Sequence, residues 1–226
     1  MQMNWMENFN CPLCGIESLD PLYARSIPYP NYDGESELTL EPKFLQLIYH
    51  ECVNCGFRYM CPRPTPESYD RYYSTMLYRN LCSATQKEMD DDERQRGNRI
   101  ASLIPPEAMS HLDVGCSRGY LLEASRDASP GKVREVLGVE PNPDYTIPGI
   151  PTVTRIEDVE GAFDVVTCIH VLEHVNAPRM VAERLMDLTK PGGILIVEVP
   201  AETYAGQSAG LPHPFAFTIP CIERLF

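Results

Sequence analysis

His111-Leu-Asp-Val-Gly-Cys-Ser-Arg-Gly119 is the stretch of sequence on which the predicted fold depends. A short apolar run leads into small residues, and the amphipathic segment 120–128 follows them. This order predicts a strand over 112–114, then a tight loop, then a helix. Small residues let the backbone approach a ligand, and the first turn of a helix presents free N–H groups. The stretch therefore predicts a ligand-binding loop at the carboxyl end of a strand.

Beyond this loop, short apolar runs alternate with amphipathic segments. Strands that alternate with helices need crossover connections, which give a parallel sheet with helices on both of its faces. The predicted fold class is therefore α/β, a doubly wound parallel sheet. Further strands are expected over 133–139, 152–154, 163–169 and 194–199, and helices over 84–103, 120–128 and 178–188. Ligands bind beyond the carboxyl ends of such strands, which places the site at 115–119, 140, 156–158 and 169–174.

The loop does not match the fingerprint of dinucleotide-binding proteins. That fingerprint needs glycine at its first, third and sixth positions, and counting from Gly115 these positions hold Gly115, Ser117 and Tyr120. About 20 residues beyond the loop, the next predicted strand ends in Glu140, whose carboxylate can accept hydrogen bonds from both hydroxyls of a ribose. The loop and the acid together indicate a cofactor that contains a ribose.

Five stretches resemble, in order, the motifs of class I S-adenosylmethionine-dependent methyltransferases. They are Leu112-Asp-Val-Gly-Cys-Ser-Arg-Gly-Tyr-Leu-Leu122, Gly138-Val-Glu-Pro-Asn142, Phe163-Asp-Val-Val166, Val171-Leu-Glu-His-Val175 and Lys190-Pro-Gly-Gly193. The resemblance implies a Rossmann-like core and S-adenosylmethionine as the cofactor. The family usually continues with two more strands, so the chain is expected to lack its C-terminal strands. Ser117 departs from the pattern, because glycine is common at its position.

The resemblance also implies which residues contact the cofactor. The methionine moiety of the cofactor is expected to contact Asp113, Gly115, Ser117 and Gly119, and its ribose is expected to contact Glu140. The adenine is expected near Glu157 or Asp158. The other residues expected to contact the cofactor are Ile169, His170, Cys116 and Pro141. The alternatives are a nucleotide-binding fold with another ligand, and a relic domain that no longer catalyses a reaction.

Two Cys-x-x-Cys pairs, each followed by glycine, lie near the N-terminus. They are Cys11-Pro-Leu-Cys14 and Cys52-Val-Asn-Cys55. Two residues between thiolates let both sulfurs reach one ion, and four sulfurs make the closed tetrahedral site that is typical of structural zinc. An iron–sulfur site is the alternative. Metal binding can contribute on the order of 10 kcal/mol to folding. Cys61 is expected to be a free thiol, and small buried side chains are expected at Cys82, Cys116, Cys168 and Cys221.

The Pro-rich segment 61–66 divides the chain into two predicted domains. Its alternate prolines lack a donor and fix φ, so we expect a stiff linker. A zinc-ribbon-like module with this linker is predicted over 1–66, with a strand over 44–50. A cofactor-binding domain is predicted over 67–226, with a helical lead-in over 67–106 that includes a helix at 69–73. The arrangement resembles methyltransferases that carry an N-terminal zinc-ribbon module, several of which act on sugars, sugar nucleotides or other small molecules.

Candidate bases follow the fourth and fifth predicted strands. Methyl transfer from a sulfonium needs positioning, and a base when the acceptor is a hydroxyl or a carbon acid. The catalytic candidates are Glu173 and His174 after the fourth strand and His213 after the fifth, with His170 as a further candidate base. The alternative for Glu173 and His174 is a packing role in their loop. We interpret the run Asp90-Asp-Asp-Glu93 as a solvated helix face.

Composition limits the partners that the protein can have. The 226 residues carry a formal net charge of −13, which repels phosphate backbones, so no nucleic-acid partner is expected. No window approaches the roughly 20 apolar residues of a membrane span, and the N-terminus lacks the features of a signal peptide. Nine cysteines without such a signal favour metal binding and free thiols. We expect a cytoplasmic protein with a small-molecule acceptor, and a homo-oligomer is left open.

These observations predict an S-adenosylmethionine-dependent methyltransferase that acts on a small molecule, with a sugar or sugar nucleotide as the leading class, and that carries structural zinc. Two alternatives remain. One is a non-catalytic zinc-ribbon binding module fused to a relic or incomplete cofactor domain. The other is an enzyme whose zinc domain recognises a protein or RNA acceptor, although the acidic charge disfavours RNA.

Overall fold

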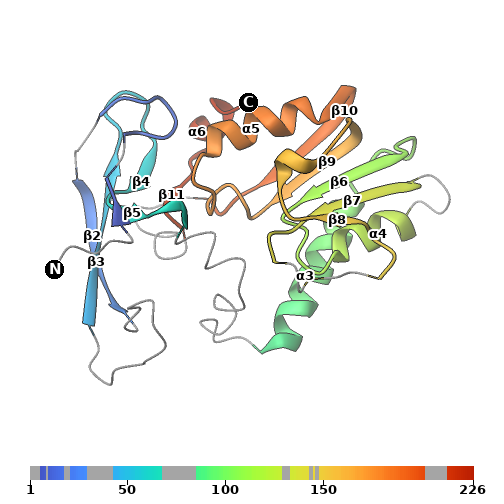
Figure 1. Cartoon of the computed structure of the whole chain (residues 1–226), viewed down its shortest axis with the longest axis horizontal. Coiled ribbons are helices and arrows are strands. Elements are labelled where there is room, and N and C mark those ends of the chain that lie inside the picture. The colour runs from blue at the N-terminus through green and yellow to red at the C-terminus, as the bar shows by residue number, and fades with distance from the viewer. Residues whose placement is uncertain are drawn as a thin grey trace. The chain divides into compact units, whose positions relative to one another are not determined.

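A computed structural model describes residues 6–8, 10–17, 21–29, 43–67, 85–128, 133–142, 145, 148–201 and 213–226 (Figure 1). The chain divides into two compact units. We call the first, Met1–Thr65 with Pro200–Leu225, the cysteine unit, and the second, Pro66–Val199, the parallel-sheet unit. The expected helix at 69–73 and Cys82 lie outside the described residues.

A five-stranded parallel sheet forms the centre of the parallel-sheet unit. Its order is β10-β9-β6-β7-β8, and every neighbouring pair is parallel. The strands are β6 (Ser110–Val114), β7 (Glu135–Val139), β8 (Thr152–Val153), β9 (Phe163–Ile169) and β10 (Thr189–Glu198). The chain adds β7 and β8 on one side of β6 and β9 and β10 on the other, so the strand order reverses at β6. The predicted doubly wound α/β fold is confirmed.

Helices cover both faces of this sheet. α3 (Gln86–Ala101) and α4 (Tyr120–Ala128) lie on one side and α5 (Pro178–Asp187) on the other (Figure 1). A capping box starts α3: Thr85 Oγ1 accepts from the backbone N–H of Glu88, and the Glu88 carboxylate accepts from the Thr85 N–H. These three helices match the predicted ones within a few residues.

The buried centre of the sheet explains why the apolar runs are continuous. β6 is buried along its whole length, as expected for a central strand of a parallel sheet. Leu112, Val165 and Val166 are fully buried, and Leu122 of α4 is fully buried on the helix side. The core therefore fixes the carboxyl end of β6, where the predicted cofactor loop begins.

β10 starts earlier than the sequence predicts. Lys190–Gly193 falls within β10 but forms an irregularity there, because Thr189 lies opposite Phe163 and the next paired residue is Ile194, opposite Val165. Nζ of Lys190 lies 3.0 Å from Oδ1 of Asp164 and 3.1 Å from Oγ of Ser110. Asp164 also accepts from the backbone N–H of Ser110. These contacts tie β6, β9 and β10 together at the amino end of the sheet.

The cysteine unit contains a four-stranded antiparallel sheet of order β11-β4-β3-β2. Its strands are β2 (Pro21–Tyr29), β3 (Lys43–Glu51), β4 (Arg58–Met60) and β11 (Phe215–Ala216). The predicted strand over 44–50 lies within β3. A short pair, β1 (Met6–Glu7) with β5 (Arg63–Pro64), is also antiparallel. The segment predicted as a stiff linker therefore contains a paired, buried strand.

The C-terminal segment packs in the cysteine unit, whereas the sequence analysis assigned it to the domain over 67–226. β11 pairs with β4, and the rings of Phe215 and Phe217 lie 5.6 and 5.1 Å from that of Phe57. After the short helix α6 (Ile219–Glu223), the guanidinium of Arg224 donates to the carbonyl oxygen of Cys55 at 2.8 Å. Backbone pairing and aromatic burial together hold the segment there.

Among the described residues, no helix has both the length and the apolar content that crossing a membrane requires.

Candidate functional site

The loop from Gly115 to Gly119 lies at the carboxyl end of β6, where the sequence analysis placed it. The backbone N–H groups of Gly115 and Cys116 both donate to the carbonyl oxygen of Val139, at 2.8 and 3.0 Å. Gly115 has a φ of 79°, and a Cβ atom there would lie 2.2 Å from Cγ2 of Val171. Only glycine fits this position. The loop is therefore closed against both neighbouring strand ends.

Ser117 also has a left-handed backbone, with a φ of 47°. Such a conformation is uncommon for a residue that is not glycine and concentrates at functional sites. This geometry gives a physical reason why glycine is common at its position in the family that the sequence resembles. The serine hydroxyl lies 3.4 Å from Oε1 of Glu93 on α3.

Glu140 joins the end of β7 to the loop. Its Oε2 accepts from the backbone N–H of Ser117 at 3.0 Å, and its Oε1 accepts from that of Asn142 at 3.0 Å. The carboxylate is buried. The acid predicted to contact a ribose thus lies against the predicted cofactor loop.

Three acidic side chains surround the loop. Asp113 is buried below it. Burial, together with the negative charges of Glu140 and Glu93, raises the pKa of Asp113 to about 7, although a hydrogen bond from Thr167 opposes the rise. The loop region therefore favours a ligand that carries positive charge.

The acidic run Asp90–Glu93 on α3 was predicted to be a solvated helix face, but only part of it is exposed to solvent. Asp91 and Asp92 are exposed, but Glu93 and Asp90 are half-buried. Asp90 lies 3.6 Å from the guanidinium of Arg118 in the loop. The run faces the loop because α3 packs along α4, which places every third or fourth residue on that side.

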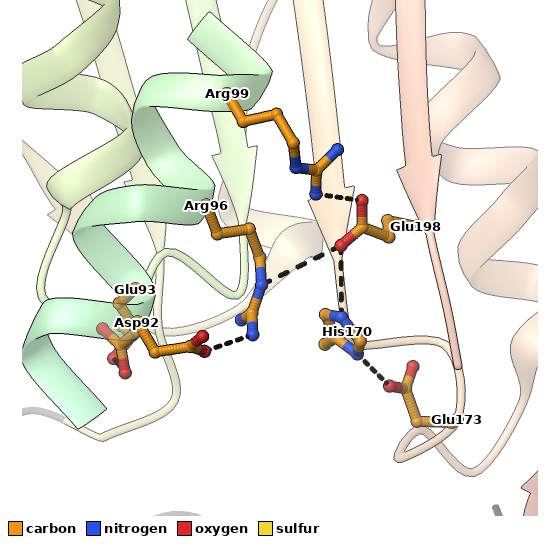
Figure 2. Close-up of polar contacts among 8 residues, drawn as sticks. Asp92, Glu93, Arg96, Arg99, His170, Glu173 and Glu198 are labelled. Atoms are coloured by element: carbon orange, nitrogen blue, oxygen red, sulfur yellow. Dashed lines mark hydrogen bonds and ion pairs between the residues drawn. The ribbon is translucent and has the colours of Figure 1, made fainter. Parts of the chain in front are cut away.

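His170 follows β9 directly and is held by Glu198 and Glu173 (Figure 2). Its backbone N–H donates to the carbonyl oxygen of Glu198 at 2.8 Å. Its Nε2 lies 3.2 Å from Oε1 of Glu198, and its Nδ1 lies 3.1 Å from Oε1 of Glu173. Its φ is 55°, a left-handed backbone conformation that is uncommon for a residue other than glycine and concentrates at functional sites.

Two arginines of α3 reach the same carboxylate. Figure 2 shows Arg99 and Arg96 directed toward Glu198: Arg99 donates to Oε2, and Nε of Arg96 lies 3.9 Å from Oε1. Partial burial alone would raise the pKa of Glu198, but the hydrogen bond from Arg99 and the charges of Arg99, His170 and Arg96 lower it overall. Glu198 is therefore an ionised acceptor.

Sequence reasoning missed Glu198, Arg96 and Arg99. One signal was present: Glu198 lies near the end of the strand predicted over 194–199, so the rule that selected Glu140 also selects it. The arginines lie on one face of the predicted helix, but charged residues on a helix face are usually solvated.

Glu173 is the most buried of the predicted catalytic residues, with a side-chain exposure of 1%. Its Oε1 faces His170, and its Oε2 is buried without a hydrogen-bond partner among the residues that the structure describes. Nε2 of His174 lies 3.9 Å from Oε1 of Glu173. His213 lies in the cysteine unit, where the Tyr49 hydroxyl donates to its carbonyl oxygen. The catalytic roles of all three stay predictions.

The remaining predicted cofactor residues lie at strand ends or beside them. Glu157 and Asp158 form the 3₁₀ helix η1 (Ile156–Asp158) and are exposed, as is Pro141. Ile169 ends β9. Cys116 is buried against Gly138, where an added Cβ would lie 2.5 Å from its Sγ. Three of the cysteines predicted as small buried side chains are buried, namely Cys116, Cys168 and Cys221, and Cys61 forms no disulfide.

The two cysteine pairs converge in the cysteine unit. The four sulfurs all lie within 4.8 Å of one another, and the Cys11–Cys55 and Cys14–Cys52 sulfurs are 3.5 Å apart. A tetrahedron with Zn–S bonds of about 2.3 Å has sulfurs about 3.8 Å apart. The donor set and its dimensions therefore fit a zinc ion held by four thiolates.

Both pairs have the same backbone hydrogen bonds. The N–H of Gly15 donates to Cys11 O at 2.7 Å, and the N–H of Gly56 donates to Cys52 O at the same distance. Burial raises the pKa of the Cys55 thiol to about 11 and that of Cys11 well above its usual range. Burial acts in the same direction on Cys14, but hydrogen bonds from the Ile16 backbone and from neighbouring side chains lower its pKa to about 6 overall. A bound cation would compensate the charge of four thiolates held this close together.

A parallel sheet with this strand reversal, a glycine loop after β6 and an acid at the end of β7 defines a Rossmann-like cofactor-binding protein. The family described as a methyltransferase domain matches residues 85–218, more than half of the chain, and the protein belongs to this family. The resemblance found in the sequence motifs is confirmed.

Individual relatives are similar over part of their length. A ubiquinone biosynthesis O-methyltransferase of Marinobacter nauticus is 33% identical over 124 residues, 49% of this chain and 52% of that protein. An uncharacterized methyltransferase of Mycobacterium tuberculosis is 29% identical over 123 residues, 48% of this chain and 47% of that protein. The chain spans about half the length of the curated relatives it matches.

Solved structures share the fold. Magnesium protoporphyrin IX methyltransferase from Synechocystis PCC 6803, with bound SAH, has a TM-score of 0.52 at 14% identity, covering 69% of this chain and 84% of that one. At this identity the likeness concerns the fold alone, which is that of class I methyltransferases.

Proposed function

We propose that this protein is an S-adenosylmethionine-dependent methyltransferase that acts on a hydroxyl-bearing small molecule and carries structural zinc. The observation that carries the proposal is Glu140, a buried carboxylate 3.0 Å from the backbone N–H of Ser117 in the loop after β6. In this position it can exchange loop contacts for the two hydroxyls of a ribose.

The charge of the site supports a cationic cofactor. The negative charges of Glu140 and Glu93 act on Asp113 at the loop, and S-adenosylmethionine supplies a positively charged, activated methyl group when bound. A neutral or anionic ligand would leave this concentration of negative charge uncompensated. Gly115 and Gly119 would let the backbone approach the cofactor, and Glu140 would orient its ribose.

We assign the acceptance of a proton from the acceptor to Glu173. Its Oε1 is oriented by Nδ1 of His170, which leaves the buried Oε2 to face an acceptor. His170 is in turn held by Glu198, which makes His170 and Glu198 positioning residues. A fixed carboxylate shielded from water suits removal of a hydroxyl proton.

The acceptor class combines two lines of support. The relative from Marinobacter nauticus is named an O-methyltransferase, and a carboxylate base suits an oxygen acceptor. The resemblance to zinc-ribbon methyltransferases points to sugars or sugar nucleotides within that class. The net charge of −13 disfavours nucleic acid as an alternative acceptor.

The zinc assignment rests on Cys11, Cys14, Cys52 and Cys55, whose sulfurs cluster within 4.8 Å. A closed set of four thiolates has no open position for a substrate, so the ion has a structural role. It would join the N-terminal turn to the turn that precedes β4.

Calorimetry with S-adenosylmethionine tests the cofactor assignment directly. Wild-type protein is expected to bind, and Glu140→Ala is expected to weaken binding at least about 10-fold, because hydrogen bonds to a charged group are lost. Glu183→Ala, on the exposed face of α5, is the matched control and should bind normally. Absence of binding, or equal affinity in Glu140→Ala, would support the non-catalytic alternative. A methyl-transfer screen against sugars and sugar nucleotides then tests the acceptor class.

A further inference from the structure

Four polar side chains form one continuous hydrogen-bonded chain inside the parallel-sheet unit. Nδ1 of His111 lies 3.0 Å from Oγ of Ser125, and Nε2 lies 2.9 Å from Oγ1 of Thr167. The Thr167 hydroxyl lies 2.6 Å from Oδ1 of Asp113, and the Ser125 hydroxyl lies 2.9 Å from the carbonyl oxygen of Leu122. The hydrogen-bonded chain ends at Asp113, which lies on β6 two residues before the cofactor loop.

This hydrogen-bonded chain is buried in the interior of the parallel-sheet unit. His111 and Thr167 are fully buried, and Ser125 is 1% exposed. Polar groups in such a place destabilise the fold unless each one is hydrogen-bonded. Burial lowers the pKa of His111 to about 3, so the ring is neutral. A neutral ring donates from one nitrogen and accepts at the other.

Counting protons gives two fully bonded states of the chain. When Asp113 is ionised, Thr167 must donate to it and has no proton left for His111. The ring then carries its proton on Nε2, and Nδ1 accepts from Ser125. The other acceptor near Thr167, the Leu112 carbonyl oxygen, is 3.4 Å away and forms a weaker bond.

When Asp113 is protonated, every donor in the chain points the other way. Asp113 donates to Thr167, Thr167 donates to Nε2 of His111, and Nδ1–H donates to Ser125. Ser125 then donates to the Leu122 carbonyl oxygen, which lies 2.9 Å from its Oγ. The two states differ by one proton and by the tautomer of a single histidine.

The groups that face Asp113 decide which state is occupied. Glu140 at the end of β7 and Glu93 on α3 act on it with negative charge. Arg118 in the loop is paired with Asp90. The thiols of Cys116 and Cys168 stay neutral, because burial raises the pKa of both. A cation bound at the loop would offset the neighbouring negative charges and lower the pKa of Asp113, which favours its ionised form.

We propose that His111 and Thr167 are positioning residues that match the charge of Asp113 to the cofactor, so that binding of cationic S-adenosylmethionine releases one proton and switches the tautomer of His111. This inference rests on the proposed cofactor. The Asp113 O–H bond breaks and its proton passes through the Thr167 hydroxyl to Nε2. The Nδ1–H bond breaks and its proton passes to Oγ of Ser125, which then donates to Nδ1. The hydroxyl proton that Ser125 held toward the Leu122 carbonyl oxygen is the one released to solvent.

Calorimetry in buffers of different ionisation enthalpy counts the released protons. With wild-type protein, S-adenosylmethionine is expected to release close to one proton at pH 6 and few or none at pH 8.5. At cofactor concentrations that saturate it, Asp113→Asn should show no proton release. Thr152→Val, which removes a hydroxyl on β8 outside the chain, should keep it.

The tautomer is observed directly by nitrogen NMR on protein labelled at its five histidines, with His111 assigned through His111→Gln. The expected result at pH 6 is the Nδ1–H tautomer without cofactor and the Nε2–H tautomer with it. Thr167→Val should abolish the change and Thr167→Ser should restore it. If Thr167→Val does not fold, the wild-type comparison alone decides.

The outcomes separate this inference from the cofactor assignment. A protein that does not bind S-adenosylmethionine contradicts the proposed function. Binding without proton release, or with one His111 tautomer throughout, contradicts only the inference. Proton release that persists in Asp113→Asn also contradicts only the inference, because another group would then be the source of the proton.

Discussion

Nε2 of His170 lies 3.2 Å from Oε1 of Glu198, and the two residues also share a backbone hydrogen bond of 2.8 Å. The pair joins the carboxyl ends of β9 and β10, which are parallel neighbours with Ile169 opposite Glu198. Glu173 faces the other ring nitrogen of His170. Glu198 therefore influences the position of the buried Glu173 carboxylate indirectly, through the His170 ring.

Replacing Glu198 is therefore expected to slow catalysis without weakening cofactor binding. Glu198→Ala should lower kcat about 10- to 100-fold, a part of the 10²- to 10⁴-fold that a general base contributes. Glu198→Gln keeps an acceptor for the ring and should lose less. The measurement is kcat and KM with an accepted substrate, alongside the calorimetric Kd for S-adenosylmethionine.

Glu183→Gln is the matched control for this test, since Glu183 pairs only loosely with Arg179 on the surface of α5. The control is expected to keep full activity. Equal kcat in Glu198→Ala and wild type would show that Glu173 is oriented by other groups, and a larger loss in Gln than in Ala would contradict the role of Glu198 as an acceptor.

Stability of the cofactor-free protein should fall as pH rises from about 4 to 7, because of Asp113. Its pKa is raised to about 7 in the folded protein from an ordinary value near 3.8. In that window the folded state holds a proton that the unfolded state has released, so each step up in pH favours unfolding. Asp113→Asn should remove this pH-dependent part of the free energy of unfolding, which is on the order of 2–4 kcal/mol.

Urea unfolding at pH 5 and pH 7.5 measures the effect as a difference between wild type and Asp113→Asn, which cancels the other carboxylates. Asp113→Asn should gain stability relative to wild type as pH rises. A constant difference between the two proteins across this range would be evidence that Asp113 titrates normally.

Asp164 is expected to have the opposite pH dependence. The hydrogen bond from Lys190 and those from Met109 and Ser110 lower its pKa to about 2 from an ordinary 3.8, against the effect of burial. Its contribution is present above pH 4 and disappears as pH falls toward 2. Asp164→Asn should be about 1–2 kcal/mol less stable at pH 7. The two proteins should converge near pH 2 in thermal unfolding, and a gap that persists there would rule out this linkage.

The sequence predicted those parts of the fold and site that depend on local patterns. Alternating apolar runs predicted the parallel sheet, and the rule about strand ends selected both the Gly115–Gly119 loop and Glu140. The loop and Glu140 lie within about 30 residues of one another in the chain, so their spacing alone indicates a common site.

Contacts between distant segments were not predictable in the same way. The bond from Arg99 to Glu198 joins residues 99 positions apart, and surface charges on a helix carry no signal for a partner. The pairing of β11 with β4 and the packing of Phe217 on Phe57 depend on a return of the chain after the fifth strand of the parallel sheet. A two-residue strand is too short to give a periodic pattern.

The paired cysteines give the last prediction, which concerns metal content. Purified protein should contain one zinc ion per chain, and Cys52→Ser should lose it, because three thiolates leave the tetrahedral set open. The loss should lower the thermal stability of the cysteine unit by several degrees or more, since metal binding contributes on the order of 10 kcal/mol to such modules. Elemental analysis and unfolding monitored with and without a chelator measure both effects.

Cys61→Ser is the matched control, because Cys61 is a buried cysteine of the same unit that forms no disulfide and lies outside the four-sulfur cluster. It should keep its zinc and respond to the chelator as the wild type does. Zinc retained in a Cys11→Ser/Cys52→Ser double variant, or iron in place of zinc in the wild type, would overturn the assignment. Equal zinc loss in Cys61→Ser would instead make Cys61 a ligand, which the fit of the other four sulfurs to one tetrahedron opposes.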